Sequence, residues 1–252
     1  MRLWRQTWLL ARNDLRQEAR RLELVMTAGF FTLVLVALFA VAFFSLKADI
    51  QPKAVPGMIW LGVAFIGALT LSRVFGRERE ANTLTALLAA PVDRLAIYLS
   101  KLVITVVILA LCSALLVPGL GSVFPHAGIF AADPIALVLL VLLGCIGYAA
   151  VGTLFAAGLA SGAGKNVLLS VILYPLTTPV LLFALVATQR LLEAHSELWA
   201  VLGQMAALDA ALIGVGAWLF ESVLVGAGPR ESGSSQSRAA RARAARSSGV
   251  SP

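Results

Sequence analysis

Six long apolar runs dominate the sequence, and they restrict the chain to folds whose segments can cross a lipid bilayer. The runs cover residues 25–46, 54–72, 102–120, 134–160, 167–188 and 206–226. Each is close to the length of about 20 residues that a helix needs to cross hydrocarbon. A transmembrane barrel would instead require short segments of alternating hydrophobicity, which the sequence lacks. The pattern predicts an all-α integral membrane protein with six transmembrane helices.

Basic residues are distributed unevenly among the segments between these runs. If the amino terminus is cytoplasmic, 17 of the 20 Lys and Arg residues fall on the cytoplasmic side, and only Lys47, Lys53 and Arg190 fall on the other. The positive-inside rule therefore predicts that both termini and residues 73–101 are cytoplasmic. The net charge of +7 indicates topology and attraction to membrane lipid. Nucleic acid is not a predicted partner, because the charges lie beside the spans without interleaved aromatic residues.

The two ends of the chain differ from the six-span domain at 25–226. Residues 1–24 predict an amphipathic interfacial helix, with Trp4 and Trp8 on its apolar side. This helix is either a plain membrane anchor or an elbow that clasps the bundle and adjoins a cytoplasmic partner. Residues 227–252 are rich in Ser, Gly, Ala and Arg and lack aromatic residues, which predicts a disordered basic cytoplasmic tail.

The cytoplasmic segment at residues 73–101 has a distinctive pattern of charge and helix signals. Residues 77–80 alternate in charge, and residues 83–90 form a short apolar stretch that Pro91 ends. Asp93 is placed to cap the helix that restarts into the third run. A helix, a break and a second helix on this face would fit a cleft in a partner, and the alternative is an ordinary interfacial loop.

Two carboxylates lie within the sixth run. Asp209 and Glu221 are 12 residues apart, which separates them by about 18 Å along a helix and excludes a direct pair. Polar groups in a membrane span are costly unless they have a partner or reach the interface. We therefore expect each to reach the interface or to contact another subunit.

Proline and glycine residues mark two of the predicted spans. Pro175 and Pro179 each remove a backbone hydrogen bond from the fifth span, which predicts a helix kink. Gly144, Gly147 and Gly152 lie in the fourth span, where the absence of a Cβ lets another helix approach closely.

The sequence offers few groups that could carry out chemistry. The string that ends at Lys165 resembles the end of a Walker A motif. However, Leu159 stands where that motif requires Gly, and Asn166 stands where it requires Ser or Thr. The only cysteines, Cys112 and Cys145, lie singly within apolar runs and form no haem-attachment motif. The sequence also shows no cluster typical of a catalytic or metal site. We therefore expect a non-catalytic subunit that binds no cofactor or metal directly.

The cytoplasmic segment carries a first resemblance to a known family. The string Arg77-Glu-Arg-Glu-x-Asn-Thr-Leu-x-x-Leu-Leu-x-x-Pro91-Val resembles the coupling-helix signature of type-2 ABC exporter permeases. It departs from that signature at Asn82, where Gly is common, and at Thr85, where Glu often follows the Leu. The resemblance implies ATPase-coupling roles for Arg77, Glu78, Arg79, Glu80, Thr83, Leu84, Leu87, Leu88 and Pro91.

A narrower resemblance covers residues 10 to 226. Five strings in the same order and spacing resemble the haem exporter protein B family, CcmB, of cytochrome c maturation. They are Pro56-Gly57-x-x-Trp60, Leu71-Ser-Arg-x-Phe75, Ala90-Pro-Val-Asp-Arg94, Gly147-Tyr-Ala-Ala-Val-Gly-Thr153-Leu and Leu173-Tyr-Pro-Leu-x-x-Pro179-Val-Leu.

This resemblance implies a type-2 ABC exporter permease-like bundle in the bacterial inner membrane. It also implies a second copy of the chain, and four partners: a cytoplasmic ABC ATPase (CcmA-like), a haem-handling membrane subunit (CcmC-like), a small single-span subunit (CcmD-like) and a periplasmic haem chaperone (CcmE-like). Partners would bind the ATP and the haem. The chain would couple ATP hydrolysis to release of the haem-loaded chaperone. The alternative is a permease that moves haem or another hydrophobic substrate across the membrane.

Overall fold

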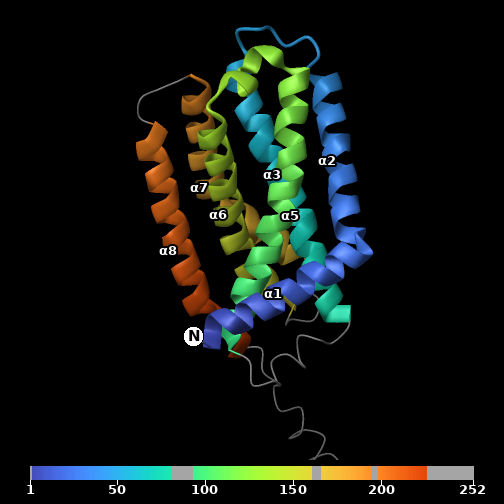
Figure 1. Cartoon of the computed structure of the whole chain (residues 1–252), viewed down its shortest axis with the longest axis vertical. Coiled ribbons are helices and arrows are strands. Elements are labelled where there is room, and N and C mark those ends of the chain that lie inside the picture. The colour runs from blue at the N-terminus through green and yellow to red at the C-terminus, as the bar shows by residue number, and fades with distance from the viewer. Residues whose placement is uncertain (1, 81–92, 161–165, 194–197, 226–252) are drawn as a thin grey trace, which may run out of the picture.

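The computed structural model describes residues 2–80, 93–160, 166–193 and 198–225. Within these ranges the chain is helical and contains no strand, which confirms the all-α prediction. The labels follow Figure 1. The helices are α1 (Arg2–Arg21), α2 (Glu23–Ala42), α3 (Gln51–Glu80), α5 (Arg94–Val123), α6 (Pro134–Ala160), α7 (Asn166–Leu192) and α8 (Leu198–Val225), with short 3₁₀ turns η1 (Pro125–Ala127) and η2 (Ile129–Ala131).

Five of these helices are long and apolar enough to cross a membrane. The qualifying segments are Glu23–Ala42, Gln51–Val74, Leu95–Val123, Pro134–Ala156 and Leu198–Leu219. In α7 the structure describes the side chains only from Thr177 onward, and the apolar segment from Thr177 to Leu192 is shorter than a span. The structure therefore supports five of the six predicted spans, and the span at 167–188 stays a prediction.

Helix ends do not coincide with the ends of the apolar runs. Helices α3 and α5 extend beyond their runs, to Glu80 and from Arg94, and α8 begins at Leu198 rather than 206. Helix α2 ends at Ala42 although its run continues to residue 46, because the backbone turns at 43–45. Hydropathy identifies the part of a segment that suits hydrocarbon, whereas a helix continues for as long as its backbone hydrogen bonds do.

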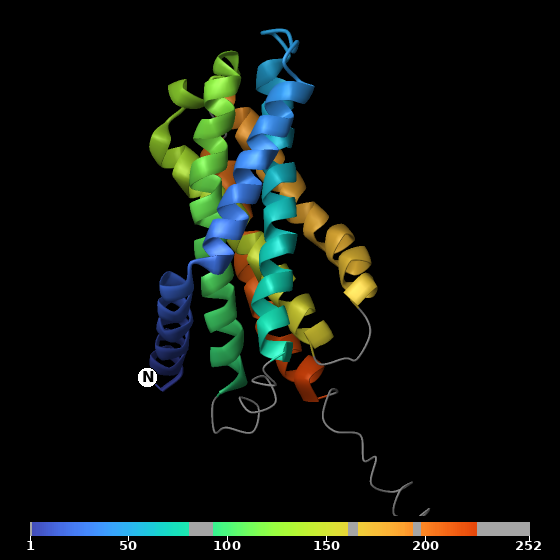
Figure 2. The ribbon, with the colours of Figure 1, turned by 90° about the vertical axis from the view of Figure 1, so that its right-hand side faces the viewer.

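The long helices lie side by side, and α1 crosses them. In Figures 1 and 2, α2, α3 and α5 to α8 run along the long axis of the molecule, while α1 lies outside the bundle against α5. Helix α6 packs against α3, α5, α7 and α8, and α5 packs against α1, α2, α3, α6 and α8, so these two helices connect the bundle.

Large aromatic side chains occupy glycine positions on neighbouring helices. Tyr148 of α6 is fully buried, and its hydroxyl donates a hydrogen bond of 2.9 Å to the carbonyl of Ala64 in α3. A Cβ at Gly67 of α3 would overlap the Tyr148 ring. The missing side chain thus makes room for the ring and brings its hydroxyl within reach of the backbone.

Two further aromatic residues repeat this arrangement. Trp60 of α3 lies over Gly144 of α6, and its indole N–H donates to the hydroxyl of Thr188 in α7 at 2.8 Å. Similarly, Tyr98 of α5 lies against Gly216 of α8 and donates to the carbonyl of Ala150 in α6 at 3.0 Å. Each aromatic residue joins different helices by packing and by a hydrogen bond.

The glycines singled out in the fourth span make the predicted close contacts. A Cβ at Gly144, Gly147 or Gly152 would overlap a side chain from another helix. The overlapping residues are Trp60 for Gly144, Asp209 and Val180 for Gly147, and Leu71 for Gly152. The prediction that these glycines permit close helix approach is confirmed.

Substitution of Gly67 tests the role of these glycine positions. We expect Gly67→Ala to lower the free energy of unfolding by about 1–3 kcal/mol, because the buried Tyr148 ring must move. Gly57→Ala on the same helix is the matched control, since nothing lies within 4 Å of a Cβ there. It should be neutral or stabilise by up to about 1 kcal/mol through helix propensity. Denaturation in mixed micelles measures the free energy of unfolding of both variants. Equal changes in the two would contradict the role of Gly67.

Candidate functional site

The predicted coupling segment joins the end of α3 to the start of α5. Arg77, Glu78, Arg79 and Glu80 form the last residues of α3. The other predicted coupling residues, Thr83, Leu84, Leu87, Leu88 and Pro91, lie outside the described residues. Asp93 precedes α5 in an extended conformation, and its Oδ1 accepts a hydrogen bond from the Leu95 backbone N–H at 3.2 Å. The predicted N-cap at Asp93 is confirmed.

Helix α1 reaches the point where this segment enters α5. The backbone N–H of Asp93 donates to Oε1 of Gln6 in α1 at 3.3 Å. Thr7 and Ala11, on the same side of α1, are buried. The amino-terminal helix therefore contacts the bundle beside the predicted coupling segment.

A partly buried ion pair fixes α1 to α5 further along both helices. Lys101 Nζ lies 2.7 Å from Asp14 Oδ2, and the two side chains are 10% and 22% exposed. Such a short, charge-assisted hydrogen bond is stronger than a pair in water. Removing one partner from a desolvated pair is costly, because the remaining charge lacks compensation. The pair therefore holds α1 in one position along α5.

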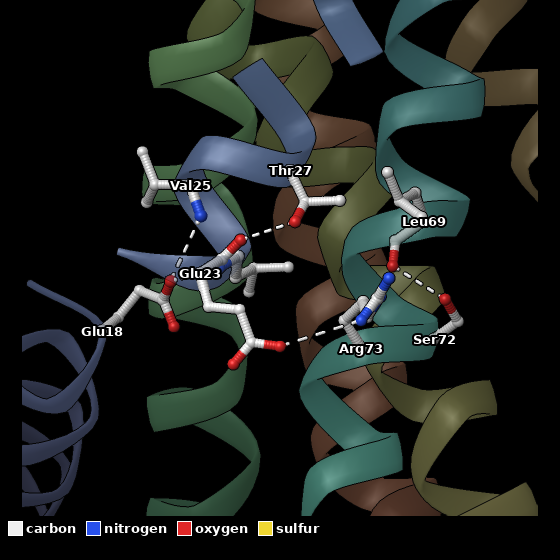
Figure 3. Close-up of polar contacts among 8 residues, drawn as sticks. Glu18, Glu23, Val25, Thr27, Leu69, Ser72 and Arg73 are labelled. Carbon is white, nitrogen blue, oxygen red and sulfur yellow. Dashed lines mark hydrogen bonds and ion pairs between the residues drawn. The ribbon is translucent and has the colours of Figure 1, made fainter. Parts of the chain in front are cut away.

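The turn from α1 into α2 is held by a second carboxylate. Glu18 is buried, and its Oε1 accepts a hydrogen bond of 2.7 Å from the backbone N–H of Leu24. It also accepts one of 3.1 Å from the backbone N–H of Val25 (Figure 3). These amides belong to the first turn of α2, where backbone donors lack partners within the helix. Leu22, between the two helices, has a φ of 53°, a left-handed conformation that costs roughly 1–2 kcal/mol for a residue with a Cβ. Glu18 stabilises the sharp turn that Leu22 makes.

A weaker contact joins α2 to α3 at the same level. Arg73 Nη1 lies 3.9 Å from Glu23 Oε1, and both side chains are about half exposed (Figure 3). An exposed pair at this distance contributes little to stability. The joint between α1 and α2 therefore depends on Glu18 more than on Glu23.

The two carboxylates predicted in the sixth run are both in α8. Asp209 is 3% exposed and lies against Gly147 of α6 and Val180 of α7, and its Oδ2 has no hydrogen-bond partner. The carboxylate thus faces helices of its own chain. Of Glu221 the structure describes only the backbone, within α8. A contact of either residue with another subunit stays a prediction.

The proline and cysteine residues singled out from the sequence lie within helices. Pro175 and Pro179 both fall inside α7, whose helix continues through them, and Pro179 is exposed. The predicted kink stays a prediction. Cys112 and Cys145 are free and buried, and Cys145 Sγ lies 3.7 Å from Ser113 Oγ. Among the described residues, no group of three His, Cys, Asp or Glu side chains could hold a metal ion.

Sequence reasoning did not single out four residues of this site: Gln6, Asp14, Glu18 and Lys101. Asp14 and Lys101 are 87 residues apart, so no local spacing rule joins them. One signal was present. Asp14 and Glu18 are the only acidic residues among the arginines of α1, and acidic residues in a basic segment are candidates for internal contacts.

Comparison with known proteins gives one family match. The family model described as CcmB protein matches residues 5–224. The matched range includes α1 from residue 5 onward, the Asp14–Lys101 pair and all five apolar spans. No curated protein matches the chain.

A double-mutant cycle tests the ion pair between α1 and α5. We expect Lys101→Met to destabilise the protein by about 2–4 kcal/mol, because it leaves the Asp14 carboxylate without its cation. The single variant Asp14→Asn and the double variant complete the cycle. We expect the loss of stability in the double variant to be smaller than the sum of the two single losses, by about 1 kcal/mol or more. Unfolding followed by tryptophan fluorescence measures all three, with exposed Asn13→Ala as the control. Strict additivity would show that the pair contributes nothing.

Glu18 can be tested in the same assay. Glu18→Ala removes the acceptor for two backbone N–H groups of α2, and we expect a loss of about 1–2 kcal/mol. Gln17→Ala changes the exposed neighbour on the same helix and should stay within about 0.5 kcal/mol of the unchanged protein. A similar loss in both variants would assign the effect to helix α1 as a whole rather than to the cap.

Proposed function

The chain belongs to the CcmB family, and from this membership we propose that it couples ATP hydrolysis by a partner ATPase to release of a haem-loaded periplasmic chaperone. The family comprises permease subunits of the ABC-type haem export system of cytochrome c maturation. Membership implies a multi-pass, non-catalytic membrane subunit and an ATPase partner. The coupling step is the part that we propose.

One observation carries this proposal: the coupling segment is connected directly to α3 and α5, and through α5 to α1 and α2. The segment begins at the end of α3 and ends at Asp93, the cap of α5. Both helices have 30 residues, with one internal proline each, Pro56 in α3 and Pro118 in α5, and each extends about 45 Å as one helical rod. Movement of the segment at one face of the membrane would therefore be transmitted towards the other face by two rods at once.

Helix α1 extends this connection to α2. Gln6 and Asp14 join α1 to the start of α5, and Glu18 joins α1 to the first amides of α2. A displacement of α5 by the partner would move α1 with it, and the cap at Glu18 would move the entry of α2. This arrangement supports coupling by rigid elements, with the conformational change made at their contacts.

We assign ATP and haem binding to partner subunits, because the sequence of this chain offers no complete motif for either. Its string at 159–166 departs from a Walker A motif at two positions, Leu159 and Asn166, so we assign ATP to a CcmA-like subunit. Haem belongs to the CcmC-like subunit and the CcmE-like chaperone, and a CcmD-like single-span subunit and a second copy of this chain complete the assembly. We place it in the bacterial inner membrane with both termini in the cytoplasm, as the distribution of basic residues favours.

The test is a pair of charges placed in the coupling segment. We expect Leu87→Glu with Leu88→Glu to abolish co-purification of the ATPase and stimulation of its hydrolysis, because two carboxylates cannot be buried in an apolar cleft without large cost. Affinity purification with mass spectrometry and an ATPase assay measure both effects. The control is Ala239→Glu with Ala240→Glu, which adds the same charge in the tail beyond the family match.

Two outcomes would contradict the proposal. Retention of the ATPase by the Leu87 and Leu88 double variant would show that the segment is not the coupling site. In vesicles that contain the whole complex, ATP-driven accumulation of haem in the lumen without release of the chaperone would instead identify a haem transporter.

A further inference from the structure

The outward side of α1 has a composition unlike that of its inward side. Thr7, Ala11 and Glu18 are buried against the bundle. At 3.6 residues per turn, Trp4 and Trp8 form an adjacent strip, and they are 77% and 63% exposed. Helix α1 therefore presents two large aromatic side chains away from the protein.

All exposed charge on α1 is positive. The two acidic residues are engaged inside the molecule, Asp14 with Lys101 and Glu18 with the first amides of α2. The arginines that follow the tryptophan strip around the helix are exposed, and none of them forms an ion pair within the part of the chain that the structure describes: Arg5, Arg12, Arg16 and Arg20. The internal contacts thus remove every negative charge from this surface.

The contacts of α1 also place this surface at the level of the membrane boundary. Helix α2, whose apolar span begins at Glu23, follows α1 after a single residue. The apolar span of α5 begins at Leu95, and Asp14 binds Lys101, which lies within that span. Helix α1 runs across the bundle rather than along it (Figure 1). A helix at this depth and in this direction lies where phospholipid headgroups are.

We propose that the exposed arginine and tryptophan strips of α1 bind the headgroups of anionic phospholipids. Tryptophan is favoured at the headgroup level, and arginine binds phosphate through several N–H donors. Each arginine near an anionic membrane surface contributes up to about a five-fold preference for that surface. Added salt weakens this preference, because the exposed charges are screened. Anionic lipid would hold α1 against the membrane while α5 holds it from the other side.

Quenching of Trp4 and Trp8 by brominated lipid tests the proposal on the full chain. The background carries Trp199→Phe and Trp218→Phe, which remove the other exposed tryptophans, while Trp60 is buried. The protein is reconstituted in vesicles of phosphatidylcholine and phosphatidylglycerol, in which one lipid or the other carries brominated acyl chains. We expect brominated phosphatidylglycerol to quench about two-fold or more strongly at equal mole fraction.

Two double variants distinguish lipid binding by α1 from attraction of anionic lipid to basic residues elsewhere in the protein. Arg12→Gln with Arg16→Gln should bring the quenching ratio close to one. Lys47→Gln with Lys53→Gln removes the same charge beyond the far end of α2 and should leave the ratio unchanged. The thermal midpoint of both variants should match that of the background, since these side chains are not part of the α1–α5 contact.

The proposal would be overturned by equal quenching with the two brominated lipids, or by a lysine pair that lowers the ratio as much as the arginine pair does. It would also be overturned if the arginine pair released the partner ATPase while leaving the lipid ratio unchanged, because the surface would then belong to a protein partner. The two quenching results do not depend on whether Leu87 and Leu88 couple the ATPase, so this test and that of the proposed function can fail separately.

Discussion

Within the hydrocarbon of a bilayer no water replaces a lost hydrogen bond, and the described bundle is organised around that constraint. Trp60, Tyr98 and Tyr148 each place their polar group on another helix, and each needs a glycine opposite to come close enough. Buried threonines instead donate to carbonyls of their own helix, as Thr32, Thr70, Thr105 and Thr188 do. The same aromatic and glycine pairs therefore provide both close packing and hydrogen bonds between helices. Asp209 departs from this pattern, because one of its oxygens is buried without a partner beside Gly147.

The sequence was sufficient for those features that depend on local composition. Long uncharged runs predict spans, since each charged residue raises the free energy of insertion into hydrocarbon independently of the rest of the fold. A glycine in such a run permits a close approach, as at Gly144, but Gly57 shows that the approach is not made at every glycine. The identity of the partner is not visible: Trp60 and Gly144 come together only in the folded bundle. Asp14 and Lys101 show the same limit, because their attraction depends on helix positions that no spacing rule specifies. The segment around Leu87 lies outside the described residues, so its role rests on the family resemblance and the proposed test.

The turn from α1 into α2 combines an unfavourable backbone conformation with favourable polar contacts. Leu22 adopts a left-handed φ at a modest cost, and Glu18 offsets that cost by accepting two amide hydrogens that would otherwise lack partners. The Asp14–Lys101 pair then fixes the direction of α1 relative to α5. A flexible joint would absorb a displacement, whereas a joint held at both ends transmits it. The same two carboxylates determine the charge of the outward surface, so the mechanical and electrostatic properties of α1 have one origin.

The 87 residues between Asp14 and Lys101 also affect the order in which the protein is made. At about 5–20 residues per second, a ribosome needs ~4–17 s to proceed from one to the other. During that interval α1 has been synthesised and its docking helix has not. Helix α1 therefore lacks its contact with α5 during that interval, and under the proposed lipid interaction its tryptophans and arginines would bind headgroups first. The contact between α1 and α5 consequently forms only when the third apolar segment has entered the bilayer.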